Sequence, residues 1–246
     1  MMIITHYTKN TGFAMRIAVV SDFHSRRGDM KTGGILSLLA AEKPDLILAP
    51  GDFFNNTHEF SVREEYNING LELLSGMTGL APVYFSVGNH EHGLTSENRR
   101  ILEDCGVHVL DNEIAVLDNL ALCGLSSGYL REKKAYKREP VPDLSIIESF
   151  ENTPGCRILL CHHPEYVPRY LSDRKIHLTV SGHAHGGQWR IGSRGAYAPG
   201  QGLLPKYVGG LYPMEHGTLC VSRGMRNTVK VPRFFNPCEI VILDLK

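Results

Sequence analysis

The sequence predicts an α/β protein in which a mixed or parallel β-sheet is covered by helices. Two observations support this fold class. Short apolar runs of β type recur along the whole chain of 246 residues, and stretches with helical spacing of apolar residues separate the first three runs. The second half is dominated by strands. No linker, low-complexity tract or internal repeat interrupts the chain, so we expect a single domain over residues 1–246.

The expected elements follow one another in a regular order. Apolar residues recur at helical spacing around 35–40 and 68–77, and a third helix is expected with Thr95 or Ser96 as its N-cap. Turn signals at residues 111–112 and 118–119 predict a meander over 107–125. Runs rich in Val, Ile and Leu predict strands at Arg16–Ser21, Asp45–Ala49, Val83–Val87, Arg157–Cys161, His177–Ser181, Thr218–Ser222 and Glu239–Leu245.

The composition limits the classes of function. The chain has 26 Lys plus Arg against 26 Asp plus Glu, which argues against a protein that coats polyanions. Nucleic acid is therefore expected only as a substrate. The first 16 residues lack the apolar core of a signal peptide and the length of a membrane span. We expect a cytoplasmic protein, with peripheral membrane contact and oligomeric state left open.

The cysteines agree with a reducing compartment. None of the six forms a C-x-x-C pair, and Cys123, Cys161 and Cys220 lie inside apolar runs of β type. These features favour buried thiols over disulfides.

Side chains that can bind metals follow five of the expected strands. The segments concerned are Asp22-Phe23-His24, Gly51-Asp52, Gly88-Asn89-His90-Glu91, His162-His163 and Gly182-His183-Ala184-His185. Ligands of open α/β sheets bind at the carboxyl ends of the strands, so these five loops are expected to converge on one site. A single Asp-x-His or Gly-Asn-His is common, but five such segments in this order are not a coincidence.

Local spacing points to the same site. Residues at i and i+2 of an extended segment project from the same face, so Asp22 with His24 and His183 with His185 are each expected to reach a shared site. Glycines precede several of these residues at positions 51, 88 and 182, where they allow sharp turns and close approach of the backbone.

This set of side chains suits hydrolysis by two metal ions. A bridging carboxylate can hold two divalent cations about 3.5–4 Å apart, and a hydroxide between them can attack phosphorus in line. Asp52 is the candidate for the bridge. Imidazole, carboxylate and carboxamide ligands together favour manganese, iron or zinc over magnesium or calcium.

The motif series resembles that of the calcineurin-like metallophosphoesterases. In this sequence it reads SDFH, GDF, GNHE, CHHP and SGHAHGGQ, and the resemblance covers essentially the whole chain. The segments GGQW, YAPGQGLLPKYVGGLY, VSRG and PRFFNPCEIVIL are similar to the bacterial YaeI/YkuE-like phosphodiesterase branch. Met225-Arg226 departs from the Leu-Gly pair that is frequent in that branch. The resemblance implies a four-layer α-β-β-α sandwich with two mixed β-sheets.

The resemblance also implies a role for each motif residue. Asp22, His24 and His185 would bind the first ion, Asp52 would bridge, and Asn89, His162 and His183 would bind the second ion. His90 would lie beside the scissile phosphate, where it stabilises charge and protonates the departing oxygen. Glu91 would orient His90 as a hydrogen-bond acceptor.

Several residues keep two interpretations. Either His162 or His163 could be the ligand, and the family pattern favours His162, with His163 left to the pocket wall. The basic run Arg131–Arg138 is read as a surface loop, or else as a lid that steers substrate. The stretch Gly192–Tyr212 is read as a flap that shapes the substrate site, or else as a passive long connection. Its aromatic residues are expected to pack it onto the fold: Trp189, Tyr197, Tyr207 and Tyr212. The remaining histidines are treated as ordinary surface or packing residues: His6, His58, His92, His108, His177 and His216.

Together these inferences predict a metal-dependent phosphoric ester hydrolase that acts on a small phosphoester, most often a diester. A phosphomonoester, a nucleic acid or a lipid-sugar pyrophosphate remains as an alternative substrate. A non-catalytic interaction module of the same fold is the rival from another class, and it should have lost ligands that this chain retains.

Overall fold

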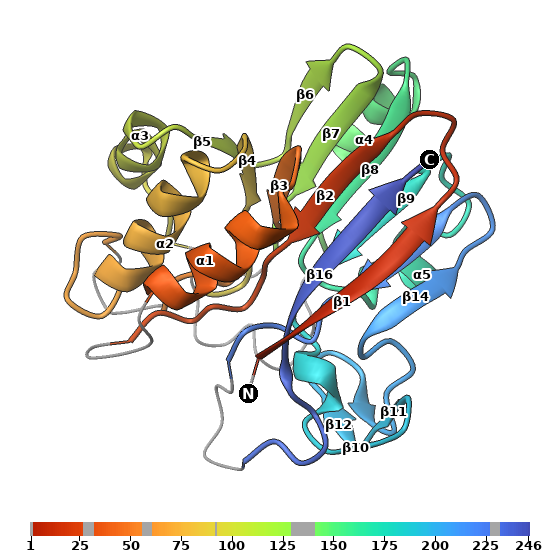
Figure 1. Cartoon of the computed structure of the whole chain (residues 1–246). Coiled ribbons are helices and arrows are strands. Elements are labelled where there is room, and N and C mark those ends of the chain that lie inside the picture. Colours follow the sequence, from red (N-terminus) through yellow and green to blue (C-terminus); the bar gives the residue numbers. More distant parts are fainter. Residues whose placement is uncertain (1, 27–31, 56–60, 92, 129–140, 227–231) are drawn as a thin grey trace.

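Two six-stranded mixed sheets face each other in the structure, with helices on both outer sides (Figure 1). The computed structural model describes residues 2–26, 32–55, 61–91, 93–128, 141–226 and 232–246. This arrangement confirms the predicted four-layer α/β sandwich. The single-domain assignment stays a prediction.

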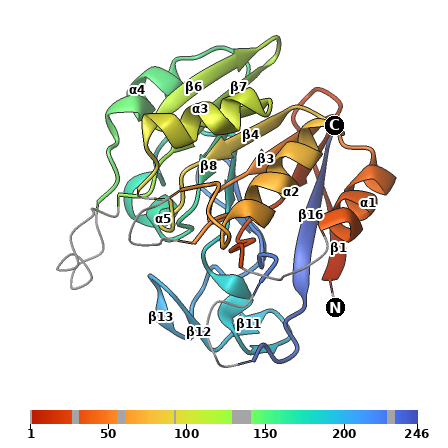
Figure 2. The same cartoon turned by 90° about the vertical axis from the view of Figure 1, so that its left-hand side faces the viewer.

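The first sheet has the strand order β1-β16-β2-β3-β4-β5. β16 runs antiparallel to β2, and the other neighbouring pairs are parallel. The helices α1 (Thr32–Glu42), α2 (Ile68–Thr78) and α3 (Ser96–Asp104) cover its outer face (Figure 2). Its strands are β1 (Met2–Lys9), β2 (Met15–Val19), β3 (Leu46–Ala49), β4 (Val83–Ser86), β5 (Val107–Leu110) and β16 (Cys238–Leu245).

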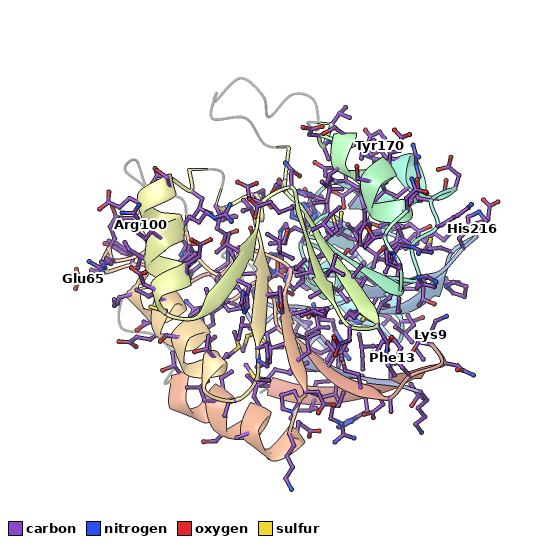
Figure 3. The ribbon with its side chains drawn as sticks, turned by 90° about the horizontal axis from the view of Figure 1, so that it is seen from above. Lys9, Phe13, Glu65, Arg100, Tyr170 and His216 are labelled. Carbon is purple, nitrogen blue, oxygen red and sulfur yellow. The ribbon has the colours of Figure 1, made fainter. Side chains whose placement is uncertain are left out.

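The second sheet has the order β14-β15-β9-β8-β7-β6, with its two outer pairs antiparallel and the rest parallel. The short helices α4 (Ser145–Glu151) and α5 (Tyr166–Tyr170) pack on its outer face. Seen from above, Arg100 of α3 and Tyr170 of α5 lie on opposite sides of the molecule (Figure 3). Its strands are β6 (Glu113–Leu117), β7 (Leu120–Leu125), β8 (Cys156–Cys161), β9 (Leu178–Ser181), β14 (Gly210–Pro213) and β15 (Thr218–Val221).

The central strands are buried on both faces, which explains their unbroken apolar runs. In β2, Ile17 and Val19 point into the core between the two sheets, whereas Ala18 packs with the helices outside. In β8, Ile158 faces the core between the sheets and Leu159 faces the opposite helical layer. The alternation therefore builds three apolar layers, and it holds the carboxyl ends of the parallel strands at fixed positions.

A small unit lies outside the two sheets, between β9 and β14. It begins with the 3-10 turn η2 (His185–Gly187) and continues with two ribbons, β10 (Arg190–Ile191) with β11 (Arg194–Gly195) and β12 (Tyr197–Ala198) with β13 (Gly202–Leu203). Figures 1 and 2 both place these ribbons at the lower end of the molecule. They occupy most of the segment that was expected to form a flap.

The aromatic residues of that segment divide into two kinds. Tyr207 and Tyr212 pack against each other with ring centroids 5.1 Å apart, as predicted. Trp189 packs against Phe234 with ring centroids 5.9 Å apart, although it is about half exposed. For Tyr197, which is also about half exposed, packing onto the fold stays a prediction.

The seven predicted strands and three predicted helices are present, with ends shifted by one to three residues. The third helix starts after Thr95, whose side chain accepts a hydrogen bond from the backbone N–H of Asn98. All six cysteines are free thiols, four of them buried. The basic run Arg131–Arg138, His58 and His92 lie outside the described residues.

The predicted meander over 107–125 is wrong. β5 pairs in parallel with β4 in the first sheet, and β6 and β7 form a hairpin in the second sheet. The turn signal at 111–112 marks the crossing between sheets, where Asn112 adopts a φ of 53°. Turn chemistry predicts that the chain reverses or bends there, but it does not specify which sheet the next strand joins.

Several further elements were not predicted, among them β1, α4 and α5. β1 carries the β-branched run Ile3, Ile4 and Thr5 and adds an edge strand beside β16. The helices α4 and α5 have seven and five residues, too few to display a helical period.

None of the helices in the described part of the chain is long and apolar enough to cross a bilayer.

Candidate metal centre

Loops after β2, β3, β4, β8 and β9 meet at one end of the sandwich. The first three belong to one sheet and the last two to the other, so the site spans both sheets. Convergence of these loops was predicted from the strand order, since ligands collect at the carboxyl ends of parallel strands. The side chains that they carry are Asp22, His24, Asp52, Asn89, His90, His162, His183 and His185.

Six of these side chains form two compact groups. Asp22, His24 and His185 each offer one ligand atom, and the three atoms lie within 4.8 Å of one another. Asp52, His162 and His183 form a second group within the same limit. Two further groups overlap with these, His24 with Asp52 and His90, and His163 with Glu165 and His183. The assignment of two ion subsites to the first two groups stays a prediction.

Asp52 lies between the two groups. Its Oδ2 is 3.1 Å from Nε2 of His162 in one group and 3.6 Å from Nε2 of His24 in the other. Its Oδ1 accepts a hydrogen bond of 2.9 Å from the backbone N–H of His90. One carboxylate oxygen is therefore fixed by the backbone, and the other faces both groups at once.

The imidazoles are oriented so that nitrogen atoms face the centre. Nδ1 of His162 donates to the carbonyl oxygen of Pro50 at 2.7 Å, and Nδ1 of His185 lies 3.0 Å from the carbonyl oxygen of Arg226. Nη2 of Arg233 also lies 3.0 Å from this Nδ1, and it donates to the Arg226 carbonyl. Nε2 of His162 lies 3.1 Å from Oδ2 of Asp52, and Nε2 of His185 lies 3.6 Å from Oδ1 of Asp22, so both nitrogens face carboxylates of the centre.

Buried nitrogen atoms in the centre fit a cation. Among the residues that the structure describes, Nε2 of His24 and Nε2 of His183 have no hydrogen-bond partner, although both are buried. Buried polar atoms are rarely left unsatisfied, and a metal ion satisfies neutral imidazole nitrogens and carboxylates together. The donor set thus suits divalent metal ions.

The electrostatics keep most of these groups in the form that binds metals. Burial lowers the pKa of His24, His183 and His185, which favours neutral imidazoles. Burial opposes ionisation of Asp52, but His162 and His90 outweigh it and hold the pKa of this carboxyl well below its usual range. Burial likewise opposes protonation of His162, but Asp52 raises the pKa of this imidazole to about 10. A cation would therefore compete with a proton at His162.

The backbone at the centre is strained. Asp22, His24, Asp52, His183 and His185 have φ values between 44° and 65°, in the left-handed region. Residues other than glycine adopt this region at a cost, and such outliers collect at functional sites. Asp22 and His24 do reach a common group, as expected, but with left-handed φ values and not in an extended segment. His183 and His185 also have left-handed φ values, and they fall in different groups.

Two glycines permit the close approach of these loops. A Cβ at Gly88 would lie 2.3 Å from Oδ1 of Asp52, and a Cβ at Gly182 would lie 2.3 Å from Oδ2 of Asp22. Any side chain at either position would displace a carboxylate of the centre. This agrees with the close approach expected of these glycines.

His90 and Asn89 lie at the mouth of the centre. The His90 side chain is 33% exposed, and its Nε2 is 4.0 Å from Oδ2 of Asp52. Its ring meets His24 edge-on at 4.6 Å between centroids. Asn89 precedes it in the same loop with a buried amide oxygen. His90 can thus be reached from solvent while it touches the carboxylate between the two groups.

Glu91 does not orient His90, contrary to expectation. Its carboxylate accepts hydrogen bonds from the backbone N–H groups of Asp52, Gly88 and Phe54 at 2.9, 2.8 and 3.0 Å. Nδ1 of His90 has no hydrogen-bond partner among the described residues. Burial and the nearby Asp52 raise the pKa of Glu91 to about 8. The three hydrogen bonds of Glu91 hold the loop after β3 against the loop after β4.

A second row of polar residues was missed by the sequence reasoning. Oε1 of Glu165 lies 3.1 Å from Nδ1 of His163 and 3.8 Å from Nε2 of His183. Nε2 of His163 in turn lies 2.7 Å from Oγ of Ser127. The His163 ring packs against those of His162 and His183. Its assignment to the pocket wall stays a prediction, because it also forms a possible ligand group with Glu165 and His183. Ser127 follows β7, so the position at a strand end could have identified it; Glu165 carried no comparable signal.

Asn236 and Arg233 reach the centre from the far end of the chain. The side-chain amide of Asn236 donates to the carbonyl oxygens of His185 and Gln188 at 2.8 and 3.2 Å. These contacts fix the η2 turn that carries His185. Both residues belong to the PRFFNPCEIVIL segment, so the branch resemblance pointed to the segment without assigning it a role.

Several known proteins have related sequences. The Caenorhabditis elegans protein F40B5.2 is 29% identical over 252 residues, which cover 97% of this chain and 50% of that protein. The chain therefore spans about half the length of this relative. YaeI of Escherichia coli, named a phosphodiesterase, is 26% identical over 97% of this chain and 85% of its own length.

The fold is also found in a solved structure. The calcineurin-like phosphoesterase YfkN from Bacillus subtilis superposes with a TM-score of 0.52 over 86% of this chain and 81% of that chain, at 14% identity. The model of the family described as calcineurin-like phosphoesterase matches residues 15–187, which include every loop of the centre. Because this match extends over most of the sequence, the chain belongs to the calcineurin-like phosphoesterase family.

Proposed function

We propose that this chain is a dinuclear metal-dependent phosphoesterase whose preferred substrates are phosphodiesters. The observation that carries the proposal is the position of Asp52, with one carboxylate oxygen within 3.6 Å of imidazoles from both ligand groups. Asp22, His24 and His185 would hold one ion and Asn89, His162 and His183 the other, with Asp52 between them. Manganese, iron and zinc suit this mixture of nitrogen and oxygen ligands.

Different residues around the ions have different roles in the proposed hydrolysis. When bound, two divalent ions neutralise phosphoryl charge and activate water as the nucleophile. His90 is the imidazole at the centre that combines solvent access with contact to Asp52, so it is assigned to protonate the departing oxygen. The carbonyls of Pro50 and Arg226 keep His162 and His185 turned toward the ions.

Preference for a diester is supported by the similarity to YaeI, which is named a phosphodiesterase. The preference for diesters over monoesters is tested by comparing bis-p-nitrophenyl phosphate with p-nitrophenyl phosphate on protein loaded with Mn²⁺. We expect kcat/KM for the diester to exceed that for the monoester. A reversed preference would assign the site to phosphomonoesters, which is the alternative within the same chemistry.

The role of Asp52 is tested separately by Asp52→Asn. An amide cannot bridge two cations as a carboxylate does, so this variant should lose bound metal and fall in turnover by several orders of magnitude. The control is Asp244→Asn, which changes a surface carboxylate paired with Arg16. Two retained ions with near-normal turnover in Asp52→Asn would refute the bridging role, and absence of metal in the wild type would favour a non-catalytic module.

A further inference from the structure

Seven large apolar side chains are exposed on one small part of the chain. Ile191, Leu203, Leu204 and Phe235 are between 82% and 88% exposed, and Trp189, Tyr197 and Phe234 are about half exposed. We call this set the ribbon face, because it lies on β10 to β13 and the adjoining residues 234–235. The other large apolar residues exposed in the described part of the chain, Leu38, Tyr66, Val116 and Val141, belong to separate segments.

The ribbon face is presented by an ordered framework. Arg190 pairs with Gly195 and Tyr197 pairs with Leu203 across the two ribbons. The side-chain amide of Gln201 bonds both the N–H and the carbonyl of Tyr207, at 2.9 and 2.7 Å. Ala198 and Val208 beneath the ribbons are fully buried. The outward position of the apolar side chains is therefore built into the fold.

Apolar exposure of this extent has a cost in water and marks an interaction surface. Trp189 and Phe234 pack together with ring centroids 5.9 Å apart, and Nε1 of Trp189 donates to the carbonyl oxygen of Pro232 at 2.9 Å. Half-exposed Trp, Tyr and Phe beside fully exposed Leu and Ile is the composition of surfaces that enter the boundary between water and lipid.

The charge around the ribbon face has one sign. No Asp or Glu occurs in the sequence from Gly186 to Met214, or from Arg223 to Cys238, although the whole chain has equal numbers of acidic and basic residues. Arg194 of β11 and Lys206, shortly after β13, are exposed. These exposed cations complement an anionic membrane surface.

From these observations we propose that the ribbon face docks this protein onto the surface of an anionic bilayer. The ribbons continue directly from His185 through η2, and Asn236 ties the Phe234-Phe235 segment to the same turn. Docking would therefore hold the candidate metal centre close to lipid headgroups. The inference goes beyond the proposed hydrolysis and does not depend on it.

The test is co-sedimentation of the full chain with vesicles of phosphatidylcholine, with and without about one third phosphatidylglycerol. The apolar variant combines Ile191→Thr, Leu203→Thr, Leu204→Asn and Phe235→Asn. Asparagine is chosen at 204 and 235 because Leu204 and Phe235 have φ values of 49° and 53°, which it tolerates. We expect binding to anionic vesicles by the wild type and at least a tenfold loss of partitioning in the variant.

The matched control removes the same number of exposed apolar residues elsewhere, with Leu38→Gln, Tyr66→Gln, Val116→Thr and Val141→Thr. It should bind as the wild type does. A second variant, Arg194→Gln with Lys206→Gln, should weaken binding to anionic vesicles by about fivefold per charge and leave weak binding to neutral vesicles unchanged. Hydrolysis of a soluble nitrophenyl ester reports folding and tests the proposed function independently of vesicle binding.

Three outcomes would overturn the proposal. The first is equal partitioning to anionic and neutral vesicles, and the second is unchanged binding by both variants. The third is a wild-type dimer in solution that the apolar variant converts to monomer without any lipid present, which would assign the ribbon face to a second copy of the chain.

Discussion

His90 is distinguished from the other imidazoles of the centre by its access to solvent. Its side chain is 33% exposed, while those of His24, His162, His183 and His185 are at most 9% exposed. A ligand gains from burial because water is excluded, but a proton donor must reach the substrate. The exposure of His90 therefore agrees with a role against the leaving group.

For His90→Ala we expect unequal losses on different esters. An alkyl leaving group needs a proton in the transition state, and nitrophenolate departs with little assistance, so kcat should fall about 10²-fold or more on an alkyl ester and much less on a nitrophenyl ester. Steady-state rates on the two esters, together with unchanged metal content, provide the measurement. Equal losses on both would indicate stabilisation of charge in place of proton donation.

Glu165 lies one step further from the ions, on the side of Nε2 of His183. Its Oε1 is 3.8 Å from this nitrogen and 3.1 Å from Nδ1 of His163. A buried carboxylate beside the metal-facing nitrogen favours a cation there, and loss of such outer partners weakens metal affinity by about 10–100-fold. We expect Glu165→Gln to raise the Kd for Mn²⁺ within that range, as measured by calorimetric titration.

Ser127→Ala is the matched control for Glu165. Oγ of Ser127 lies 2.7 Å from Nε2 of His163, whereas Glu165 lies at Nδ1 on the other side of that ring. Removal of the Ser127 hydroxyl should leave the Kd for Mn²⁺ within about threefold of the wild type. If Glu165→Gln binds Mn²⁺ as tightly as the wild type, the Glu165 carboxylate has no role in metal binding.

At the scale of elements, the centre depends on contacts between loops that follow different strands. Glu91, in the loop after β4, accepts two backbone N–H groups of the loop after β3. It also accepts the N–H of Gly88 in its own loop. These bonds hold Asp52 beside His90, and Glu91 is fully buried.

We predict that Glu91→Ala lowers the free energy of unfolding by about 3 kcal/mol, because three buried N–H groups would lose their acceptor at about 1 kcal/mol or more each. Glu91→Gln should cost less, since the amide oxygen still accepts. Midpoints of urea denaturation at constant m-value would measure both changes. Equal stability of Glu91→Ala and the wild type would show that the three hydrogen bonds of Glu91 do not stabilise the fold.

The sequence predicted the elements of the centre better than the contacts between them. Strand ends and ligand types could be read from local patterns, because both depend on residues close in sequence. The crossing after β5 depends on which sheet receives β6, and Glu91 accepts from residues that lie 37 and 39 positions away. The left-handed φ of five centre residues arises from the packing of loops, for which no local pattern exists.

For the whole molecule, the decisive feature is that the two sheets share one centre. Asp22, His24 and Asp52 follow strands of the first sheet, whereas His162, His183 and His185 follow strands of the second. Each compact group contains members from both sheets. Bound ions would therefore tie the two halves of the sandwich together, in addition to the apolar layer between them.

Removal of metal should consequently destabilise the whole fold and not the loops alone. An ion that binds only the folded state at 1,000 times its Kd stabilises by about 4 kcal/mol per site. In a chain of this size, two such sites correspond to roughly 16–32 °C in Tm. We expect a chelator to lower Tm of the Mn²⁺-loaded protein by this amount and renewed Mn²⁺ to restore it. Asp52→Asn should show no such response, because it lacks the shared carboxylate. The protein must first be shown to contain two ions. If the chelator then leaves its Tm unchanged, the ions bind without stabilising the contact between the two sheets.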